Sequence, residues 1–288
     1  MTNEPTVCAI LLTRDRPELA AKAVECFRKQ TYKNAHLLIC DSSDSPLWPT
    51  RSCNPVASDP APGVAQHNNI TLVWMPVSRW VVPQTIGSLR NTACELPFQR
   101  PDIFVHFDDD DWSHPNRIAE QVAFLKASGA DCVGYNEMLF WRTVKLLPNP
   151  DDGNREAEAW LYTATRGGVP ALGTSLCYWR KTWERHHFAN ETQGVEDHWM
   201  REKNVMAIGA RGEPFQNVEH PELWMNAPSF QALPDHMREH GLGEPRMIAR
   251  IHGRNTSNGY NLEDHVAKGS REWKRVPEWN SRVREILG

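Results

Sequence analysis

Short apolar runs that end at polar or acidic residues dominate the first part of the chain. Residues 7–12 and 36–40 are two such runs, long enough for buried strands. Between them, Asp15, Pro17 and Glu18 form a helix-start signal, and the apolar residues that follow recur on one helical face. Strand, helix and strand in close succession predict a βαβ unit, which implies a parallel sheet with its ligands at the carboxyl ends of the strands.

The same pattern continues toward the C-terminus. Further short apolar runs predict strands at residues 70–75, 103–107, 132–135, 174–178, 205–208 and 247–251. Helical spacing predicts helices at residues 86–96 and 196–203, and one that starts at Ser113 with Pro115 and is closed by Gly129.

Two polar stretches, residues 42–69 and 148–158, are predicted to be loops. The first is rich in Pro, Ser, Asn and Asp and is long for a compact domain, which makes it a candidate lid or acceptor element. We expect one α/β domain over residues 1–260, with a mostly parallel central sheet flanked by helices. Residues 261–288 are expected to form a C-terminal tail packed on this domain, with Trp273 and Trp279 as its anchors.

Composition and charge exclude several classes of protein. The net charge of −4 provides no basic excess of the kind that neutralises a phosphate backbone, so bulk nucleic-acid binding is not suggested. No apolar run is long enough for a membrane-spanning helix, and the first residues lack the features of a signal peptide. We therefore expect a cytoplasmic protein without stable membrane insertion. The seven cysteines are widely spaced, without a CxxC pair, and are predicted to be reduced and buried.

Four consecutive aspartates, Asp108 to Asp111, directly follow the predicted strand at residues 103–107. Adjacent carboxylates at the mouth of a buried strand repel one another, and a hard cation such as Mg²⁺ or Mn²⁺ would relieve that repulsion. Because alternate residues of an extended segment project to opposite sides, Asp108 and Asp110 can share one face. The alternative is a solvated acidic loop or a helix-capping cluster. A calcium EF-hand is excluded, because Ser113 stands where its loop requires glycine.

Four segments, taken in order and spacing, carry a family resemblance. They are residues 7–30 with Arg16-Pro17-Glu18-Leu19, then Arg90-Asn91, then the run from Phe107 to Pro115, and finally Gly194-Val195-Glu196-Asp197. Over most of residues 5–260 the sequence resembles the family-2 type glycosyltransferases with the GT-A fold. That resemblance implies a Rossmann-like α/β fold and an enzyme that moves a sugar from a nucleoside-diphosphate-sugar to an acceptor hydroxyl.

For the donor, the resemblance implies that Asp41, with Asp44 close by, contacts the nucleobase or ribose. Asp41 is equally well explained as a turn-forming residue. Two serines stand where the family carries a second Asp and a Gly, so the donor base is open, with a UDP-sugar favoured. Arg90 would lie near the diphosphate, the alternative being a surface helix arginine. Thr13 is a further donor-site candidate.

For the metal, Mn²⁺ or Mg²⁺, the resemblance implies ligation by Asp108 and Asp110, with Asp109 beside the donor. His252 resembles a histidine that many members place near the metal or diphosphate, and Arg254 could pair with phosphate. For His252 the alternative is a packed or solvent-exposed histidine.

For the acceptor side, the resemblance places the catalytic base at Asp197, with Glu196 orienting it or binding acceptor, and implies an inverting reaction. The alternative is an acidic pair at a helix N-terminus. Residues 173–175 have a family counterpart that lines the donor sugar. Trp179 or Trp199 could build the acceptor wall.

Two other functions fit parts of the pattern. A sugar nucleotidyltransferase would need a glycine-rich, basic loop after the first strand, and residues 13–17 contain no glycine. A catalytically silent nucleotide-sugar or carbohydrate-binding protein would suit the aspartates and the twelve tryptophans, which otherwise serve core packing. The acceptor is open: a glycan, a lipid-linked glycan, a small molecule, a protein or a modified nucleic-acid base are all compatible.

Overall fold

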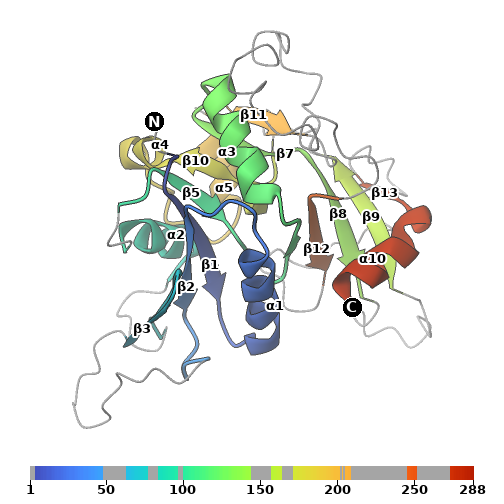
Figure 1. Cartoon of the computed structure of the whole chain (residues 1–288), viewed down its shortest axis with the longest axis horizontal. Coiled ribbons are helices and arrows are strands. Elements are labelled where there is room, and N and C mark those ends of the chain that lie inside the picture. The colour runs from blue at the N-terminus through green and yellow to red at the C-terminus, as the bar shows by residue number, and fades with distance from the viewer. Residues whose placement is uncertain are drawn as a thin grey trace.

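The computed structural model describes most of the chain. The described residues are 4–47, 63–76, 84–96, 100–143, 157–163, 171–201, 203, 205–208, 245–251 and 273–288. They form two β-sheets with helices packed around them (Figure 1). None of the helices in these ranges has the length and apolar character needed to cross a bilayer.

The larger sheet has eight strands in the order β11-β7-β10-β5-β1-β2-β4-β3. Its strands are β1 (Val7–Thr13), β2 (Ala35–Asp41), β3 (Gly63–His67), β4 (Ile70–Trp74), β5 (Ile103–His106), β7 (Cys132–Tyr135), β10 (Cys177–Trp179) and β11 (Val205–Ile208). All of them except β3 and β10 point in the same direction. The predicted βαβ unit and mostly parallel central sheet are thus confirmed.

Helices cover both faces of this sheet because β1 is apolar on both sides. Its alternate residues enter two separate cores: Ala9 packs with α1 (Pro17–Arg28) and α3 (Arg117–Ser128), while Ile10 packs on the other face. That second core contains α2 (Ile86–Glu95), α4 (Arg180–Arg185) and α5 (Val195–Met200). A continuous apolar run is what a strand buried on both faces requires.

A second sheet lies beside the first, at the right of Figure 1, in the order β13-β9-β8-β12-β6. Its strands are β6 (Trp112–Ser113), β8 (Glu137–Arg142), β9 (Glu158–Thr163), β12 (Met247–Ile251) and β13 (Trp273–Arg275). Helix α10 (Asn280–Leu287) contributes Val283 to a small core on this sheet. Trp273 is buried, as predicted for an anchor, and stacks edge-on with Phe140. The boundary at residue 260 stays a prediction.

Several predicted elements need correction. The predicted loop at residues 42–69 contains β3, which pairs with β4. The strand predicted at residues 174–178 is shorter, because a 3-10 helix, η2 (Gly173–Ser175), precedes β10. Helix α3 begins at Arg117 rather than at Ser113, which belongs to β6. Of the strands in the second sheet, only the one at residues 247–251 was predicted.

Other expectations hold. Gly129 closes α3 in the left-handed conformation, with φ of 65°, as a C-terminal glycine does. The six described cysteines are buried and free, and Cys53 lies outside the described residues.

Asp15, however, does not cap α1: it has a φ of 53°, and Arg16 occupies the cap position without a side-chain bond.

Candidate active site

The candidate site lies at the carboxyl edge of the main sheet. Thr13 ends β1, Asp41 ends β2, and the four aspartates follow β5. Thr13 and Asp41 are register partners, and β5 runs parallel to β1 on its other side. Because parallel strands end at the same edge of a sheet, these segments meet where α/β proteins commonly bind ligands.

Exposure alternates along the four aspartates, although they form a turn closed by a bond from the Asp111 N–H to the Asp108 carbonyl rather than the expected extended segment. The side chains of Asp108 and Asp110 are 26% and 15% exposed, whereas that of Asp109 is 1% exposed and Asp111 is buried. Asp108 and Asp110 are therefore the two carboxylates of this turn that a ligand could reach.

Arg16 and Thr13 hold the middle of the acidic turn. The Arg16 guanidinium places Nε 3.1 Å from Asp109 and donates through Nη1 to Asp110 at 3.0 Å. The Thr13 hydroxyl donates to Asp109 at 2.7 Å. Arg16 was noted in the sequence only as part of a segment that carries the family resemblance, and its pairing with the aspartates was not predicted.

Arg90 joins the acidic turn to a segment more than a hundred residues away. Its Nη2 donates to Asp108 at 2.8 Å and its Nε to Glu196 at 3.1 Å. The residue is buried in α2, so the alternative of a surface helix arginine is wrong. Among the described residues, Arg90 Nη1 is buried without a hydrogen-bond partner, which leaves one donor of this guanidinium unused.

Arg117 holds both ends of the acidic turn from beneath. This fully buried residue donates to the His106 carbonyl at 2.7 Å, before the turn, and to the Ser113 hydroxyl at 2.8 Å, after it. It also donates to the Thr174 carbonyl at 3.3 Å, and the Thr174 hydroxyl donates to Asp111. Sequence reasoning missed Arg117, because a buried arginine on an amphipathic helix has no local signal.

A buried hydrogen-bond chain fixes the strand before the turn. Burial lowers the pKa of His106 well below its usual range, and the Arg90 cation adds to this, so the imidazole is neutral. Its Nδ1 lies 2.8 Å from the Gly173 carbonyl, which can only accept, so Nδ1 carries the proton. Nε2 therefore accepts from the Tyr178 hydroxyl at 3.3 Å, and Tyr178 in turn lies 3.5 Å from Cys94.

The carboxylates of the turn differ in pKa. Burial raises the pKa of Asp109 to about 7, with repulsion from Asp110 adding to the effect and Arg16 opposing it. Burial and repulsion from Asp110 and Asp108 raise the pKa of Asp111 well above its usual range. Burial would also raise the pKa of Asp108, but Arg90 outweighs it and the net shift is downward. Negative charge therefore exceeds what the neighbouring arginines neutralise.

The residues of the turn fit a hard divalent cation. Asp108 and Asp110 are partly exposed, and the pKa of Asp109 between them is raised to about 7. An added positive charge would stabilise the ionised form of these carboxylates. No group of three or more His, Cys, Asp or Glu side chains in the described part of the chain is arranged to hold a metal. A cation here would depend on oxygens from a bound phosphate, which is how Mg²⁺ is commonly held.

Asp41 has the structure of a turn-forming residue. It is completely buried, and its two carboxylate oxygens accept from the backbone N–H groups of Ser43 at 3.0 Å and Leu47 at 2.8 Å. Contact with a nucleobase or ribose stays a prediction and would require this turn to open. Asp44 lies exposed after it.

Glu196 and Asp197 begin α5, and only Glu196 is tied to the acidic turn. Asp197 is the exposed member of the pair; partial burial raises its pKa, and the Glu196 carboxylate adds to this. One carboxylate oxygen of Glu196 accepts from Arg90, and its predicted role of orienting Asp197 or binding acceptor stays a prediction. A Cβ on Gly173 would lie 2.6 Å from the Glu196 Cβ, so only glycine allows η2 to pack this closely on α5.

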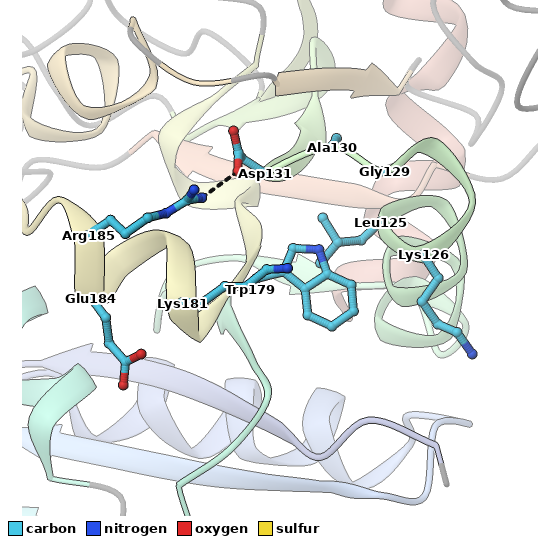
Figure 2. A pocket seen from close by; sticks show the side chains of 9 residues that line it. All are labelled: Leu125, Lys126, Gly129, Ala130, Asp131, Trp179, Lys181, Glu184 and Arg185. Atoms are coloured by element: carbon cyan, nitrogen blue, oxygen red, sulfur yellow. Dashed lines mark hydrogen bonds and ion pairs between the residues drawn. The ribbon is translucent and has the colours of Figure 1, made fainter. Parts of the chain in front are cut away.

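The remaining predicted site residues lie outside the described part of the chain or away from this cluster. His252 and Arg254 lie outside the described residues. Trp199 is buried and donates to the His186 carbonyl at 2.6 Å, so it packs the core and builds no acceptor wall. Trp179 pairs with Ile103 at the start of β5, at the opposite edge of the sheet from the acidic turn, where it lines the pocket shown in Figure 2.

Comparison with known proteins gives only distant likenesses. No family model matches the chain, and no curated protein does. S. aureus TarS 1–349 in complex with UDP-GlcNAc shares 11% identity at a TM-score of 0.48, over 91% of this chain and 64% of that one. Mannosyltransferase PcManGT from Pyrobaculum calidifontis, in complex with GDP-Man and Mn²⁺, shares 16% identity at a TM-score of 0.47, over 97% and 68%.

Another structure of S. aureus TarS 1–349 shares 13% identity at a TM-score of 0.46, over 70% of this chain. The chain spans 58% of that protein's length and 35% of the longer S. aureus TarS. These likenesses are too distant to transfer an activity, a donor or a metal to this chain, so its function has to be inferred from its own site.

The Arg90 bridge predicts a stability effect that is independent of any activity. In Arg90→Lys, one ammonium cannot reach both Asp108 and Glu196, so we expect the free energy of unfolding to fall by about 2–3 kcal/mol. Urea unfolding measures it. The matched control is Arg28→Lys, an exposed arginine of α1, for which no change is expected. Equal stability of the two variants would contradict the bridge.

The raised pKa of Asp109 predicts how stability depends on pH. Between the ordinary pKa of 3.8 and about 7, the unfolded state has lost the proton that the folded state keeps, so rising pH favours unfolding. Asp109→Asn mimics the protonated form and removes this effect. From pH 5 to pH 7, wild type should lose stability relative to Asp109→Asn, by at most about 1.4 kcal/mol per pH unit. Parallel stability curves from urea titrations would show that Asp109 ionises normally.

Proposed function

We propose that this chain is a glycosyltransferase that moves a sugar from a nucleoside-diphosphate-sugar to an acceptor hydroxyl, with inversion. The observation that carries the proposal is the buried Arg90, which joins Asp108 of the acidic turn to Glu196 beside Asp197. One cation thus joins the acidic turn to the residue that precedes the candidate base in the sequence. A purely structural acidic loop would not require an arginine that also contacts Glu196.

The side of the proposed site that would bind the nucleotide-sugar consists of paired charges and one unused hydrogen-bond donor. Arg90 Nη1 is buried without a partner among the described residues, so a local shift of the site would let it donate to a phosphate oxygen, a geometry that suits arginine. Asp108 and Asp110 would hold a divalent cation, Mn²⁺ or Mg²⁺, whose charge would stabilise the leaving nucleoside diphosphate. Thr13 and Arg16 keep Asp109 and Asp110 in place. Thr174, held to Asp111, lies where the donor sugar is expected.

Asp197 is the proposed general base. An acceptor hydroxyl must lose its proton as it attacks the anomeric carbon, and a carboxylate of raised pKa takes that proton more readily. Its exposure leaves it open to an acceptor, whereas Glu196 is committed to Arg90. A single base on the face opposite the leaving group gives inversion. The cytoplasmic location and the favoured UDP-sugar stay predictions.

Donor hydrolysis tests the proposal without knowledge of the acceptor, because water can take its place. The protein is mixed with UDP-, GDP- and dTDP-sugars and Mn²⁺, and nucleoside diphosphate release is measured. Asp110→Asn and Asp197→Asn should each lower release by about 100-fold or more. Glu25→Gln, an exposed carboxylate of α1, is the control and should leave release unchanged.

Release that is unaffected by either substitution would overturn the mechanism. Pyrophosphate formed from a nucleoside triphosphate would instead indicate a sugar nucleotidyltransferase. Tight donor binding without hydrolysis or transfer would indicate a silent nucleotide-sugar-binding protein.

The small number of protein ligands predicts cooperative binding of cation and nucleotide. With two partly exposed carboxylates, Mn²⁺ should bind weakly alone and at least about tenfold more tightly with a nucleoside diphosphate present. Isothermal titration calorimetry with Mn²⁺, with and without UDP or GDP, measures the coupling. Asp197→Asn should retain it and Asp110→Asn should lose it. Tight Mn²⁺ binding without nucleotide would show a complete protein metal site.

A further inference from the structure

A cavity of about 470 Å³ opens at the edge of the main sheet opposite the acidic turn, between the end of α3 and α4 (Figure 2). Trp179 and Leu125 give it an apolar side, and Asp131, Lys181, Glu184 and Arg185 surround them. Its volume is that of a small-molecule site. None of the residues of the acidic turn lines it.

The tryptophan of this cavity is held in a fixed frame. Trp179 ends β10, packs partly against the main core, and donates its backbone N–H to the Asp131 carbonyl at 3.4 Å. The Thr182 hydroxyl donates to the same carbonyl at 3.2 Å. The indole is half-buried, so part of its surface faces the cavity. A ligand would meet a ring that is already oriented, which lowers the entropic cost of binding.

The polar groups around the ring are of both signs and nearly balanced. Arg185 donates to Asp131 at 2.7 Å, and Arg180 pairs with Glu184. The Lys181 ammonium lies 5.5 Å from the centre of the Trp179 ring. In Figure 2, the Lys126 ammonium points away from Trp179 and Asp131. The Arg185 guanidinium is thus paired with a carboxylate, and Asp131 and Glu184 in the cavity wall would repel an anionic ligand.

Strong donors and acceptors beside an aromatic ring suit a polyhydroxylated ligand with one apolar face. Each sugar hydroxyl can donate to a carboxylate and accept from an ammonium or guanidinium. The C–H face of a pyranose packs on an indole. We propose that this cavity binds a hexopyranose unit of a glycan, with its ring on Trp179 and its hydroxyls on Asp131, Arg185 and Lys181.

This second site is distinct from the site of sugar transfer. Trp179 pairs with Ile103, and Asp108 lies five residues further along the chain, so the two sites are separated by roughly 16 Å of strand. One sugar unit cannot occupy both. If the proposed transferase activity is correct, the cavity gives the protein a second contact with a glycan chain; sugar binding itself does not depend on that activity.

Fluorine NMR of the full chain labelled with 5-fluorotryptophan tests the proposal. The Trp179 resonance is assigned as the one that disappears in Trp179→Phe. The labelled protein is titrated with methyl glycosides of glucose, galactose, mannose and N-acetylglucosamine, without nucleotide or metal. At least one should shift this resonance with a dissociation constant of about 1–10 mM, the range of weak single-ring binding. Buried Trp160 should not respond and serves as an internal reference.

Substitutions separate a built site from a general surface effect. Asp131→Asn and Arg185→Gln should each weaken sugar binding by at least about threefold through loss of one charged partner. Lys22→Gln, an exposed lysine of α1 that does not line the cavity, is the control and should bind as wild type. No shift with any glycoside would overturn the proposal, as would equal shifts with sorbitol, which has no ring. A shift with inorganic phosphate alone would show an anion site instead. Because donor and cation are absent, these results are independent of the transferase assay.

Discussion

The excess negative charge at the end of β5 is the constraint on which the rest of the site depends. Four consecutive carboxylates cannot be placed beside a buried strand unless cations or protons compensate them. The structure uses Arg16 and Arg90 as direct partners and the buried Arg117 as a support behind the turn. These three arginines come from the start of α1, the middle of α2 and the start of α3, so the helices that carry them are fixed relative to the turn.

The arginines do not neutralise all the negative charge of the turn, and the remaining charge determines which ligands the site favours. Arg90 keeps Asp108 ionised, whereas the more buried Asp109 retains its proton to about pH 7. The site thus combines a charged, partly exposed carboxylate with neighbours whose ionisation an added cation would favour. A site that gains stability when extra positive charge arrives is suited to a ligand that brings phosphate and metal together.

The sequence was informative where the signal is local. Apolar runs bounded by polar residues correctly predicted β1, β2, β4, β5 and the βαβ unit, because strands buried on both faces leave an unambiguous pattern. The second sheet was missed apart from β12, since two of its strands, β6 and β13, are only two and three residues long and leave no periodic pattern. Arg16 and Arg117 were missed as site residues for another reason: their partners are distant in sequence, and only tertiary packing brings them together. The prediction grouped Asp108 with Asp110, the two aspartates that are partly exposed, but it assumed an extended backbone where the chain forms a turn.

The acidic turn is also the place where the chain passes from one sheet to the other. It leaves the main sheet at His106 and enters the second sheet at Trp112, where β6 pairs with β12. The four aspartates therefore span a joint with both ends fixed. A change in the tilt between the sheets would alter the spacing of Asp108 and Asp110 without touching either residue. Residues far along the chain, in β12 and the strands beside it, thus influence how the carboxylates are spaced.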